Sequence, residues 1–367
     1  MEAAFSKPIV EMVSINQEIH KFLVAWTIVL ACLCYSHTTA KFFPKGKSRF
    51  LAIIPIVFVF FILPLYLTSA HLGFTPVLFI TWLANFKLLL FAFGKGPLVS
   101  TQPLPLSTFI PLACLPIEFQ NSSISDVETI KKIRPKSTLN HVAKITLLAI
   151  MIRMYNYKDY LHPKIILSFY CLHIYFMLEI LLTMVRTMVQ AFSRVEVEPP
   201  FDEPYMSSSV QNFWGRRWNR RVTSILRLTI YNPVRSIAMN WIPRKWVSLP
   251  AVLTTFLVSG LMHELLFYYT GRLKPNGKVF GYFIIQGVTV TLEIVIKKLW
   301  NGKTWVPRII SVPLTLSFML HTSFWLFLPP LLRGRADVNG WCTESLAFLE
   351  FIRYGKLVSP TNFTCPF

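Results

Sequence analysis

One ionisable pair, His263 followed by Glu264, lies within a long apolar segment of the sequence, residues 249–269. A titrating group surrounded by hydrocarbon costs a few kcal/mol or more, so such a group usually lines a cavity and has a function. Neutral imidazole accepts a proton near neutral pH, which makes histidine a natural general base. The pair therefore indicates proton-transfer chemistry within a membrane, such as deprotonation of a hydroxyl during acyl transfer. A structural histidine bonded to a neighbouring helix is the alternative.

A second candidate site is the segment 211–221, in which aromatic and cationic side chains are interleaved. Around Asn219 it contains Trp214, Arg216, Arg217, Trp218, Arg220 and Arg221. Guanidinium groups bind phosphates, and tryptophan rings stack on cations and favour membrane interfaces. The segment predicts either a contact with a phosphate-bearing nucleotide or an interfacial stretch with snorkelling arginines.

The elements that position these residues are predicted to be membrane helices. Hydrophobic residues make up 53% of the 367-residue chain and charged residues only 15%, whereas soluble domains carry about 25% charged residues. The longer apolar segments, at about 1.5 Å per residue, can cross roughly 30 Å of hydrocarbon. Eight spans are expected, at residues 22–35, 50–67, 74–93, 142–154, 165–185, 249–269, 279–296 and 309–328, of which 142–154 is the weakest. We therefore expect one all-α, membrane-embedded domain over residues 1–367.

The chain is strongly basic, with 37 Lys and Arg residues against 17 Asp and Glu residues, a formal net charge of +20. The basic residues cluster between apolar segments, which is typical of cytosolic loops that meet anionic head groups or CoA phosphates. Nucleic acid is not an expected partner, because every basic cluster borders an apolar segment. The stretch 192–247 is expected to be a cytosol-facing loop that carries the motifs, and 248–335 to hold the helices around His263.

Several other kinds of chemistry lack their sequence signatures. The sequence contains no GxSxG, no GxxxxGK[ST], no HExxH and no histidine followed five residues later by aspartate. Its six cysteines form no CxxC and have no histidine at zinc spacing. These absences disfavour a serine hydrolase, a P-loop ATPase and a metalloprotease, and we expect no metal site.

Three stretches together resemble the plant wax synthases of the membrane-bound O-acyltransferase (MBOAT) superfamily: Phe201-Asp-Glu-Pro-Tyr205, residues 212–219 and residues 258–264. Residues 83–98 are similar to the amino-terminal part of the same family. The resemblance implies a multi-pass bundle of membrane helices that encloses a catalytic tunnel, which acyl-CoA enters from the cytosol. It also implies residence in the endoplasmic reticulum.

The resemblance implies a role for each candidate residue. His263 matches the signature histidine and is expected to be the general base. Asn219 is expected to be the second catalytic residue, and Glu264 to orient the imidazole. Acyl-CoA is expected as a co-substrate, with no bound cofactor. The residues expected to hold it are Trp214, Arg216, Arg217, Trp218, Arg220 and Arg221.

The acyl acceptor is the least determined part of the prediction. The overall likeness favours a long-chain fatty alcohol and a wax ester product. A sterol O-acyltransferase and a diacylglycerol acetyltransferase of the same family are alternatives. A membrane transporter or a non-catalytic lipid-binding scaffold is the alternative of another class, although no paired repeats typical of transporters are evident. Asn121 and Asn362 begin N-glycosylation triplets, which matter only if they face the lumen.

Overall fold

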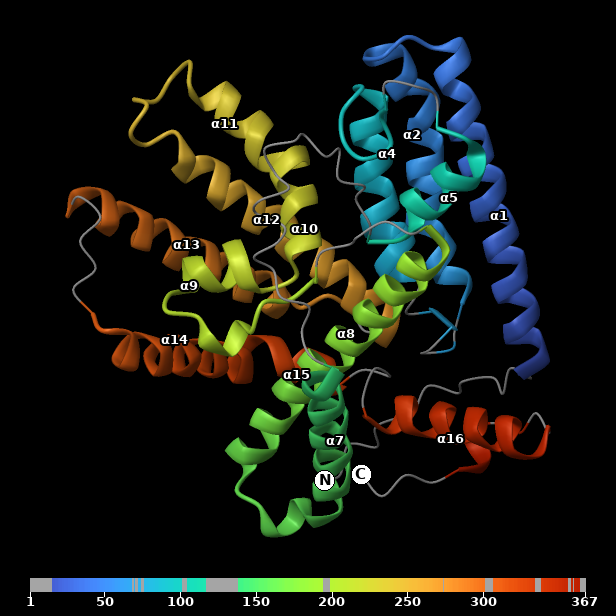
Figure 1. The fold of residues 1–367 in the computed structure, drawn as a ribbon, viewed down its shortest axis with the longest axis vertical. Helices are drawn as coiled ribbons and strands as arrows, with labels where there is room; N and C mark the ends of the chain where they lie inside the picture. Colours follow the sequence, from blue (N-terminus) through green and yellow to red (C-terminus); the bar gives the residue numbers. More distant parts are fainter. Residues whose placement is uncertain are drawn as a thin grey trace, which may run out of the picture.

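The computed structural model describes residues 15–67, 69, 72–73, 76–100, 104–116, 138–193, 199–272, 274–300, 306–333, 338–355, 358 and 360–363. Over these residues the chain is helical and has no strand (Figure 1). Asn121 lies outside the described residues, and Asn362 is exposed at the end of a short 3-10 turn.

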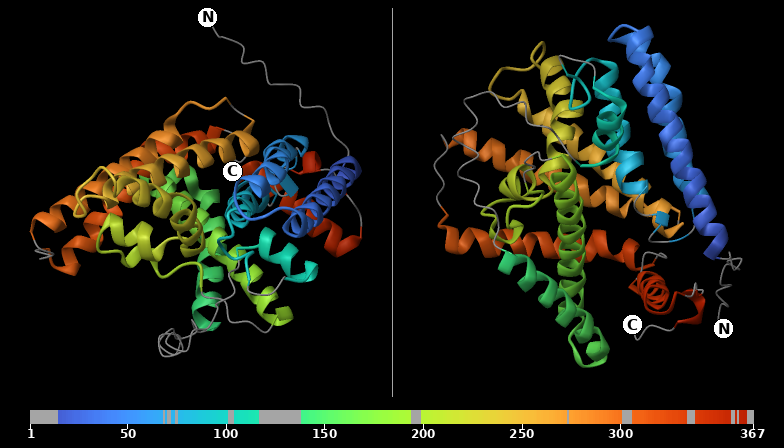
Figure 2. Two further views of the ribbon diagram at one scale, coloured as in Figure 1. Left: turned by 90° about the horizontal axis from the view of Figure 1, so that it is seen from above. Right: turned by 45° about the vertical axis from the view of Figure 1, so that its right-hand side comes forward.

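The first part of the fold is a group of helices with a core of its own. It consists of α1 (Ile15–Phe42), α2 (Lys47–Ile62), the π-helical turn η2 (Val77–Ala84), α4 (Asn85–Ala92) and α5 (Leu106–Cys114). These helices lie together at one edge of the molecule, in blue and cyan in Figures 1 and 2. Leu33, Phe60, Leu88 and Phe109 are fully buried between them, because apolar residues face the shared interior of all these elements.

Three cations are bonded to main-chain carbonyl groups near helix ends in and beside this group. Lys87, which has no exposed surface, donates from Nζ to the Leu112 carbonyl over 2.6 Å. Arg49 donates to the carbonyl of Phe43, and Arg272 donates to that of Leu67. The last carbonyls of a helix lack intrahelical partners and carry partial negative charge. These cations therefore stabilise helix ends.

The second part of the fold surrounds the candidate site. Its helices outside the stretch 192–247 include α7 (Thr138–Met154), α8 (Pro163–Ser193), α12 (Ser248–Gly271), α13 (Lys278–Leu299), α14 (Arg308–Thr322), α15 (Leu328–Arg333) and α16 (Val338–Tyr354). In Figure 1, α8 crosses the middle of the molecule, and α12 and α13 run side by side to its left. Gly287 allows this close approach, because a Cβ atom there would lie 2.7 Å from Cβ of Phe256.

The stretch expected to be a loop, 192–247, is mostly helical over its described residues, and the expectation is corrected. It contains η5 (Pro204–Met206), α9 (Val210–Asn212), η6 (Phe213–Arg217), α10 (Arg220–Leu226), η7 (Arg227–Tyr231) and α11 (Asn232–Ala238). Side chains cap two of these helices: Ser209 accepts from the Asn212 amide, and Asn219 accepts from the Val222 amide. α11 and α12 then form an antiparallel hairpin (Figure 1).

Six helices of the described chain are long and apolar enough to cross a membrane, and each contains, to within a residue at its end, one of the eight predicted spans. The other two predicted spans are not among these six helices. Residues 78–92 form an apolar helix that is buried on almost all sides, and 142–154 lies in α7, which has 17 residues. The predicted count of eight spans is therefore not confirmed.

Candidate active site

A cavity of about 930 Å³ lies in the second part of the fold and contains His263 and Asn219 in its wall. Its lining residues on α12 run from Val252 to Thr270, which at about 1.5 Å per residue corresponds to about 27 Å. The cavity thus follows most of one membrane-spanning helix, with His263 in the middle. Its size is near the upper end of the roughly 300–1,000 Å³ seen for ligand sites.

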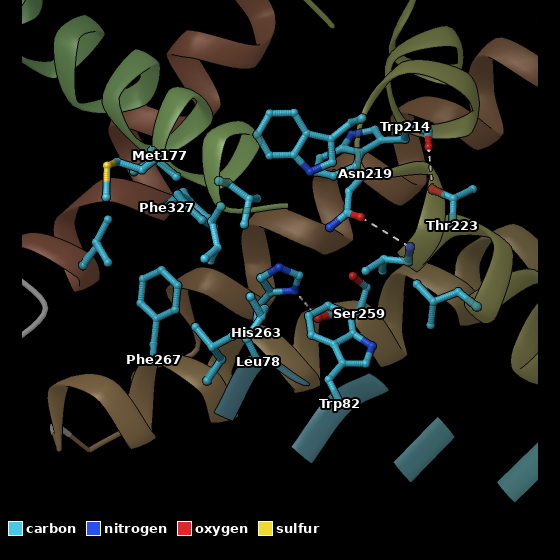
Figure 3. Close-up of a pocket in the computed structure, with 18 of the residues that line it drawn as sticks. Leu78, Trp82, Met177, Trp214, Asn219, Thr223, Ser259, His263, Phe267 and Phe327 are labelled. Carbon is cyan, nitrogen blue, oxygen red and sulfur yellow. Dashed lines mark hydrogen bonds between the residues drawn. The ribbon is translucent and has the colours of Figure 1, made fainter. Parts of the chain in front are cut away.

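The cavity extends to both sides of His263. The hairpin arm is the part of the cavity lined by Arg227 and Tyr231 of η7 and by Val252 and Thr255 of α12. The α8 arm is lined by Tyr170, His173, Met177, Phe267 and Phe327. Figure 3 shows Met177, Phe267 and Phe327 on the opposite side of His263 from Trp214 and Thr223.

The His263 ring is held in one orientation and one tautomer. Nδ1 lies 2.8 Å from the Ser259 carbonyl oxygen, which can only accept a hydrogen bond. Nδ1 therefore carries the proton of the neutral ring, and Nε2 keeps its lone pair. Phe283 stacks on the imidazole with 4.2 Å between ring centroids, and Trp82 meets it edge-on at 4.7 Å. The arrangement presents a basic nitrogen to the cavity.

Asn219 faces His263 across the cavity (Figure 3). Its backbone is left-handed, with φ 35° and ψ 64°, at the N-cap of α10. Oδ1 accepts from the Val222 amide at 3.4 Å, so the amide nitrogen is turned toward the cavity, where it faces Nε2 of His263. Nε2 of His263, a hydrogen-bond acceptor, and the amide N–H of Asn219, a donor, therefore face the same part of the cavity.

Trp214 and Trp218 both line the cavity. The indole N–H of Trp214 donates to Oε1 of Gln286 over 3.2 Å, and Gln286 is fully buried. Trp218 stacks on Phe213, with ring centroids 5.3 Å apart. Both rings are thus fixed by neighbours and form an aromatic wall.

Glu264 does not orient the imidazole, and this expectation is corrected. Its carboxylate accepts hydrogen bonds from the backbone amides of Asn276, Gly277 and Phe280, at 2.8–2.9 Å. These amides belong to the start of α13, where unpaired N–H groups attract negative charge. Glu264 therefore fastens α12 to the start of α13, and the Ser259 carbonyl orients the ring.

The four arginines expected at the CoA phosphates, Arg216, Arg217, Arg220 and Arg221, do not line this cavity. Arg217 donates from Nε to Oδ1 of Asn212 and from Nη1 to the Asp202 carbonyl, each over 2.9 Å. It therefore holds the start of the motif segment in place. Arg221 is buried, whereas Arg216 is exposed.

Arg227 was not among the arginines expected at the CoA phosphates. Among the described residues, however, Arg227 lines the cavity. Tyr231, four residues later, lines it as well. The spacing places both side chains on one face of a helix, and this regularity could have separated Arg227 from the arginine cluster before it. An exposed guanidinium at the hairpin arm is suited to a phosphate or carboxylate group.

A buried cluster between α7 and α8 supports the motif segment from behind. Nζ of Lys144 lies 2.7 Å from the Glu179 carboxylate, and both side chains are buried. Tyr175, between them and the motif, contacts Phe201 and Trp218 through its ring, at 5.5 and 6.0 Å. Outside the spanning helices, burial and then the Glu203 carboxylate raise the pKa of the Tyr205 phenol, which keeps this neighbour uncharged.

π-helical turns recur around the cavity. Each of the four turns in the described chain, η2, η6, η7 and η8 (Ser323–Phe327), contributes at least one lining residue. They supply Leu78, Trp82, Trp214, Gly215, Arg227, Tyr231 and Phe327. Such turns are rare and concentrate at functional sites. No group of three His, Cys, Asp or Glu residues suited to a metal occurs in the described parts of the chain.

Comparisons with known proteins identify the family of the chain. Residues 197–285, which include the motif segment and all of α12, match the model of the membrane bound O-acyl transferase family. The chain is 43% identical to acyl-CoA–sterol O-acyltransferase 1 of Arabidopsis thaliana, over 84% of this chain and 89% of that one. It is 39% identical to the long-chain-alcohol O-fatty-acyltransferase of Simmondsia chinensis, over 89% of this chain and 93% of that one.

The chain belongs to the membrane bound O-acyl transferase family. The resemblance of its motifs to this family is confirmed. It is accordingly an integral membrane enzyme that transfers acyl groups to hydroxyl oxygens.

Proposed function

We propose that this protein esterifies a lipophilic alcohol with the acyl group of acyl-CoA, in the membrane of the endoplasmic reticulum. The acceptor that we favour is a long-chain fatty alcohol, which gives a wax ester. The observation that carries the proposal is the bond from His263 Nδ1 to the Ser259 carbonyl, which leaves a basic Nε2 inside a large apolar cavity opposite Asn219.

In the proposed reaction, Nε2 of His263 takes the proton of the acceptor hydroxyl. The alcohol oxygen attacks the thioester carbonyl carbon, and the carbonyl oxygen becomes negatively charged. The amide N–H of Asn219 donates a hydrogen bond to that oxygen. The carbon–sulfur bond then breaks, and the CoA thiolate takes the proton from His263 as the ester forms.

The two arms suit the two substrates of such a reaction. CoA carries several negative phosphates, and Arg227 with Tyr231 in the hairpin arm offers a cation and a hydroxyl to them. The α8 arm is mostly apolar and suits the hydrocarbon of the acceptor. His263 lies between the arms, at the place where the thioester and the hydroxyl would meet.

A sterol acceptor is the second candidate, because the relative that is 43% identical to the chain bears the name of a sterol acyltransferase. A rigid ring system and an extended chain make different demands on the shape of the α8 arm. Both substrates present one hydroxyl to His263, so the same mechanism serves either.

The test uses microsomes from a yeast strain that lacks its own neutral-lipid acyltransferases. The chain and its His263→Ala variant receive labelled acetyl-CoA or palmitoyl-CoA, with long-chain alcohol and sterol in the same reaction. We expect one ester that depends on His263, with a loss of roughly 10²- to 10⁴-fold in the variant. A membrane-inserted protein that forms no ester above the empty-vector background would favour the transporter or scaffold alternative.

A further inference from the structure

Asn219 holds a backbone conformation that a residue with a side chain disfavours. Its φ of 35° lies in the left-handed region, and among the described residues other than glycine only Glu203 and Arg272 share a positive φ. This conformation costs roughly 1–2 kcal/mol for a residue with a Cβ atom, so the surrounding structure must hold it in place. The contacts that hold Asn219 therefore belong to the site.

Main-chain hydrogen bonds fix the chain on both sides of Asn219. The Asp202 amide donates to the Arg217 carbonyl over 3.0 Å. The Arg220 amide donates to the Pro200 carbonyl over 2.9 Å. The two segments are thus paired, and Asn219 lies within the paired part, between the two bonds.

The pairing is anchored in the core by Phe201. This side chain is fully buried, and its ring meets the Trp218 ring edge-on with 5.2 Å between centroids. Trp218 directly precedes Asn219, and its own amide donates to the Phe213 carbonyl over 2.9 Å. The position of the residue before Asn219 is therefore determined by packing as well as by hydrogen bonds.

The Arg217 side chain crosses the pairing from the other side. Nη1 donates to the carbonyls of Asp202 and Glu203, at 2.9 and 3.2 Å. Nε donates to Oδ1 of Asn212 over 2.9 Å, and the side chain is 15% exposed. One guanidinium group thus joins three acceptors, two residues before Asn219. The fork geometry of arginine suits such a joint, which lysine cannot reproduce in full.

We propose that Arg217 is a positioning residue. Its side chain and residues 200–203 hold Asn219 in the left-handed conformation and so aim the Asn219 amide at the carbonyl oxygen of the thioester. This inference rests on the proposed acyl transfer and deepens it. A displacement of about 1 Å at a reacting site can cost on the order of 10²-fold in rate. Arg217 therefore acts on turnover through Asn219 and not on the binding of acyl-CoA.

The first experiment separates positioning from binding. Arg217→Met keeps a long apolar side chain without a donor. In microsomes, with the alcohol that the wild-type protein esterifies, its kcat should fall roughly tenfold or more, whereas its KM for palmitoyl-CoA should stay within about twofold. Arg217→Lys keeps a cation that can reach one carbonyl and should recover part of the kcat. A higher KM with an unchanged kcat would place Arg217 at the acyl donor and overturn the inference.

The second experiment asks whether Arg217 acts through Asn219. Glycine adopts a positive φ without strain and is a tolerable N-cap, so Asn219→Gly removes the amide and needs no positioning. In this background Arg217→Met should lower kcat no further. The same fold loss in both backgrounds would contradict the inference, because a general structural role would not depend on Asn219. If Arg217→Met does not accumulate in the membrane, Arg217→Lys takes its place in the comparison.

Asp202→Asn is the matched control, because the pairing uses the main chain of Asp202 and not its side chain. The carboxylate is 55% exposed and lies 4.0 Å from Nη1 of Arg217, and an exposed ion pair contributes little. This variant should keep the kcat and KM of the wild-type protein. A fall in kcat as large as that of Arg217→Met would assign the effect to the ion pair and refute the positioning role. Wild-type protein that forms no ester at all would instead overturn the proposed function.

Discussion

At the scale of single residues, Asn219 satisfies the backbone and the proposed chemistry with one amide group. Its left-handed φ of 35° disfavours most side chains, and asparagine tolerates it better than other residues with a Cβ atom. Oδ1 caps α10, which leaves the N–H groups for the cavity. Aspartate would keep the cap but would have no donor.

Asn219→Asp therefore separates the two tasks. A carboxylate remains a good N-cap and tolerates the same backbone, so the protein should accumulate in the membrane at its normal level. We expect turnover to fall about 10²- to 10³-fold, because a negative oxygen would face the developing oxyanion. The measurement is ester formation per mole of membrane-inserted protein. Full activity in this variant would show that the side chain of Asn219 serves only the helix.

Glu264→Gln tests the residue whose expected role the structure corrects. The neutral amide is a weaker acceptor for the three backbone amides at the start of α13. We expect a loss of about 2 kcal/mol in stability, seen as a lower Tm of the purified protein. Turnover below that Tm should exceed that of His263→Ala by at least an order of magnitude. A Glu264→Gln variant that is as inactive as His263→Ala but keeps the Tm of the wild-type protein would show that Glu264 takes part in catalysis.

The sequence permitted the prediction of some of these residues and not of others, for physical reasons. His263 is predictable, because it interrupts a long apolar run. Asn219 was predicted only through its family motif, since a polar residue among arginines carries no pattern of its own. The predicted role of Glu264 in orienting the imidazole was wrong, and helix geometry could have argued against it. Adjacent residues of an α-helix point about 100° apart, so Glu264 need not share the direction of His263.

At the scale of elements, the contact between α12 and α13 sets the position of the general base. Gly260 lies one turn before His263 and faces α13, where a Cβ atom would come within 3.0 Å of Phe280 and 3.1 Å of Phe283. Phe283 is the ring that stacks on His263. The absence of a side chain at residue 260 thus keeps the two helices close and the imidazole in place.

Gly260→Ala is expected to separate the helices by a few tenths of an ångström and to shift Phe283. The cost should be about 1–3 kcal/mol in stability, with lower turnover. Gly281→Ala is the matched control on α13, because a Cβ atom there meets nothing within 4 Å. The control should keep its Tm and activity. Equal effects of both substitutions would mean that backbone freedom, not packing, explains them.

The long elements were predictable and the short ones were not. Six predicted spans coincide with long apolar helices, because hydropathy over about twenty residues averages out local detail. The stretch 192–247 was predicted as a loop because its described helices have three to seven residues and are interrupted by π-helical turns. Neither leaves room for a 3.6-residue period to appear in the sequence.

At the scale of the whole molecule, the excess of basic residues has more than one role. Lys87 and Arg49 bond to carbonyl groups near helix ends, and Arg217 fixes the motif segment. Arg227 instead lines the cavity. The number of cations predicts a chain that meets negative charge, but only the packing tells which cations are used internally.

Arg227→Ala should raise the KM for acyl-CoA about tenfold with little change in kcat, because a charge-assisted contact to a phosphate is lost. High salt should raise the KM of the wild-type protein for acyl-CoA. The difference in KM between the wild-type protein and Arg227→Ala should then become smaller. Arg216→Ala is the control, because Arg216 is exposed and does not line the cavity. If Arg216→Ala raised the KM for acyl-CoA more than Arg227→Ala did, the arginine cluster and not Arg227 would be the binding site for the CoA phosphates.

The π-helical turns at the cavity have a consequence for how the chain length can vary. A π turn holds one residue more than an α turn, so loss of a single codon within η7 would leave a regular α-helix instead of a break. Everything that follows would rotate by about 100°, and Tyr231 would leave the cavity wall. A deletion of Thr229 should therefore lower the abundance of folded protein less than a single-residue deletion within α13. It should lower turnover more. In a scan of single-residue deletions, those within the four π-helical turns should lower activity more strongly than they lower protein abundance.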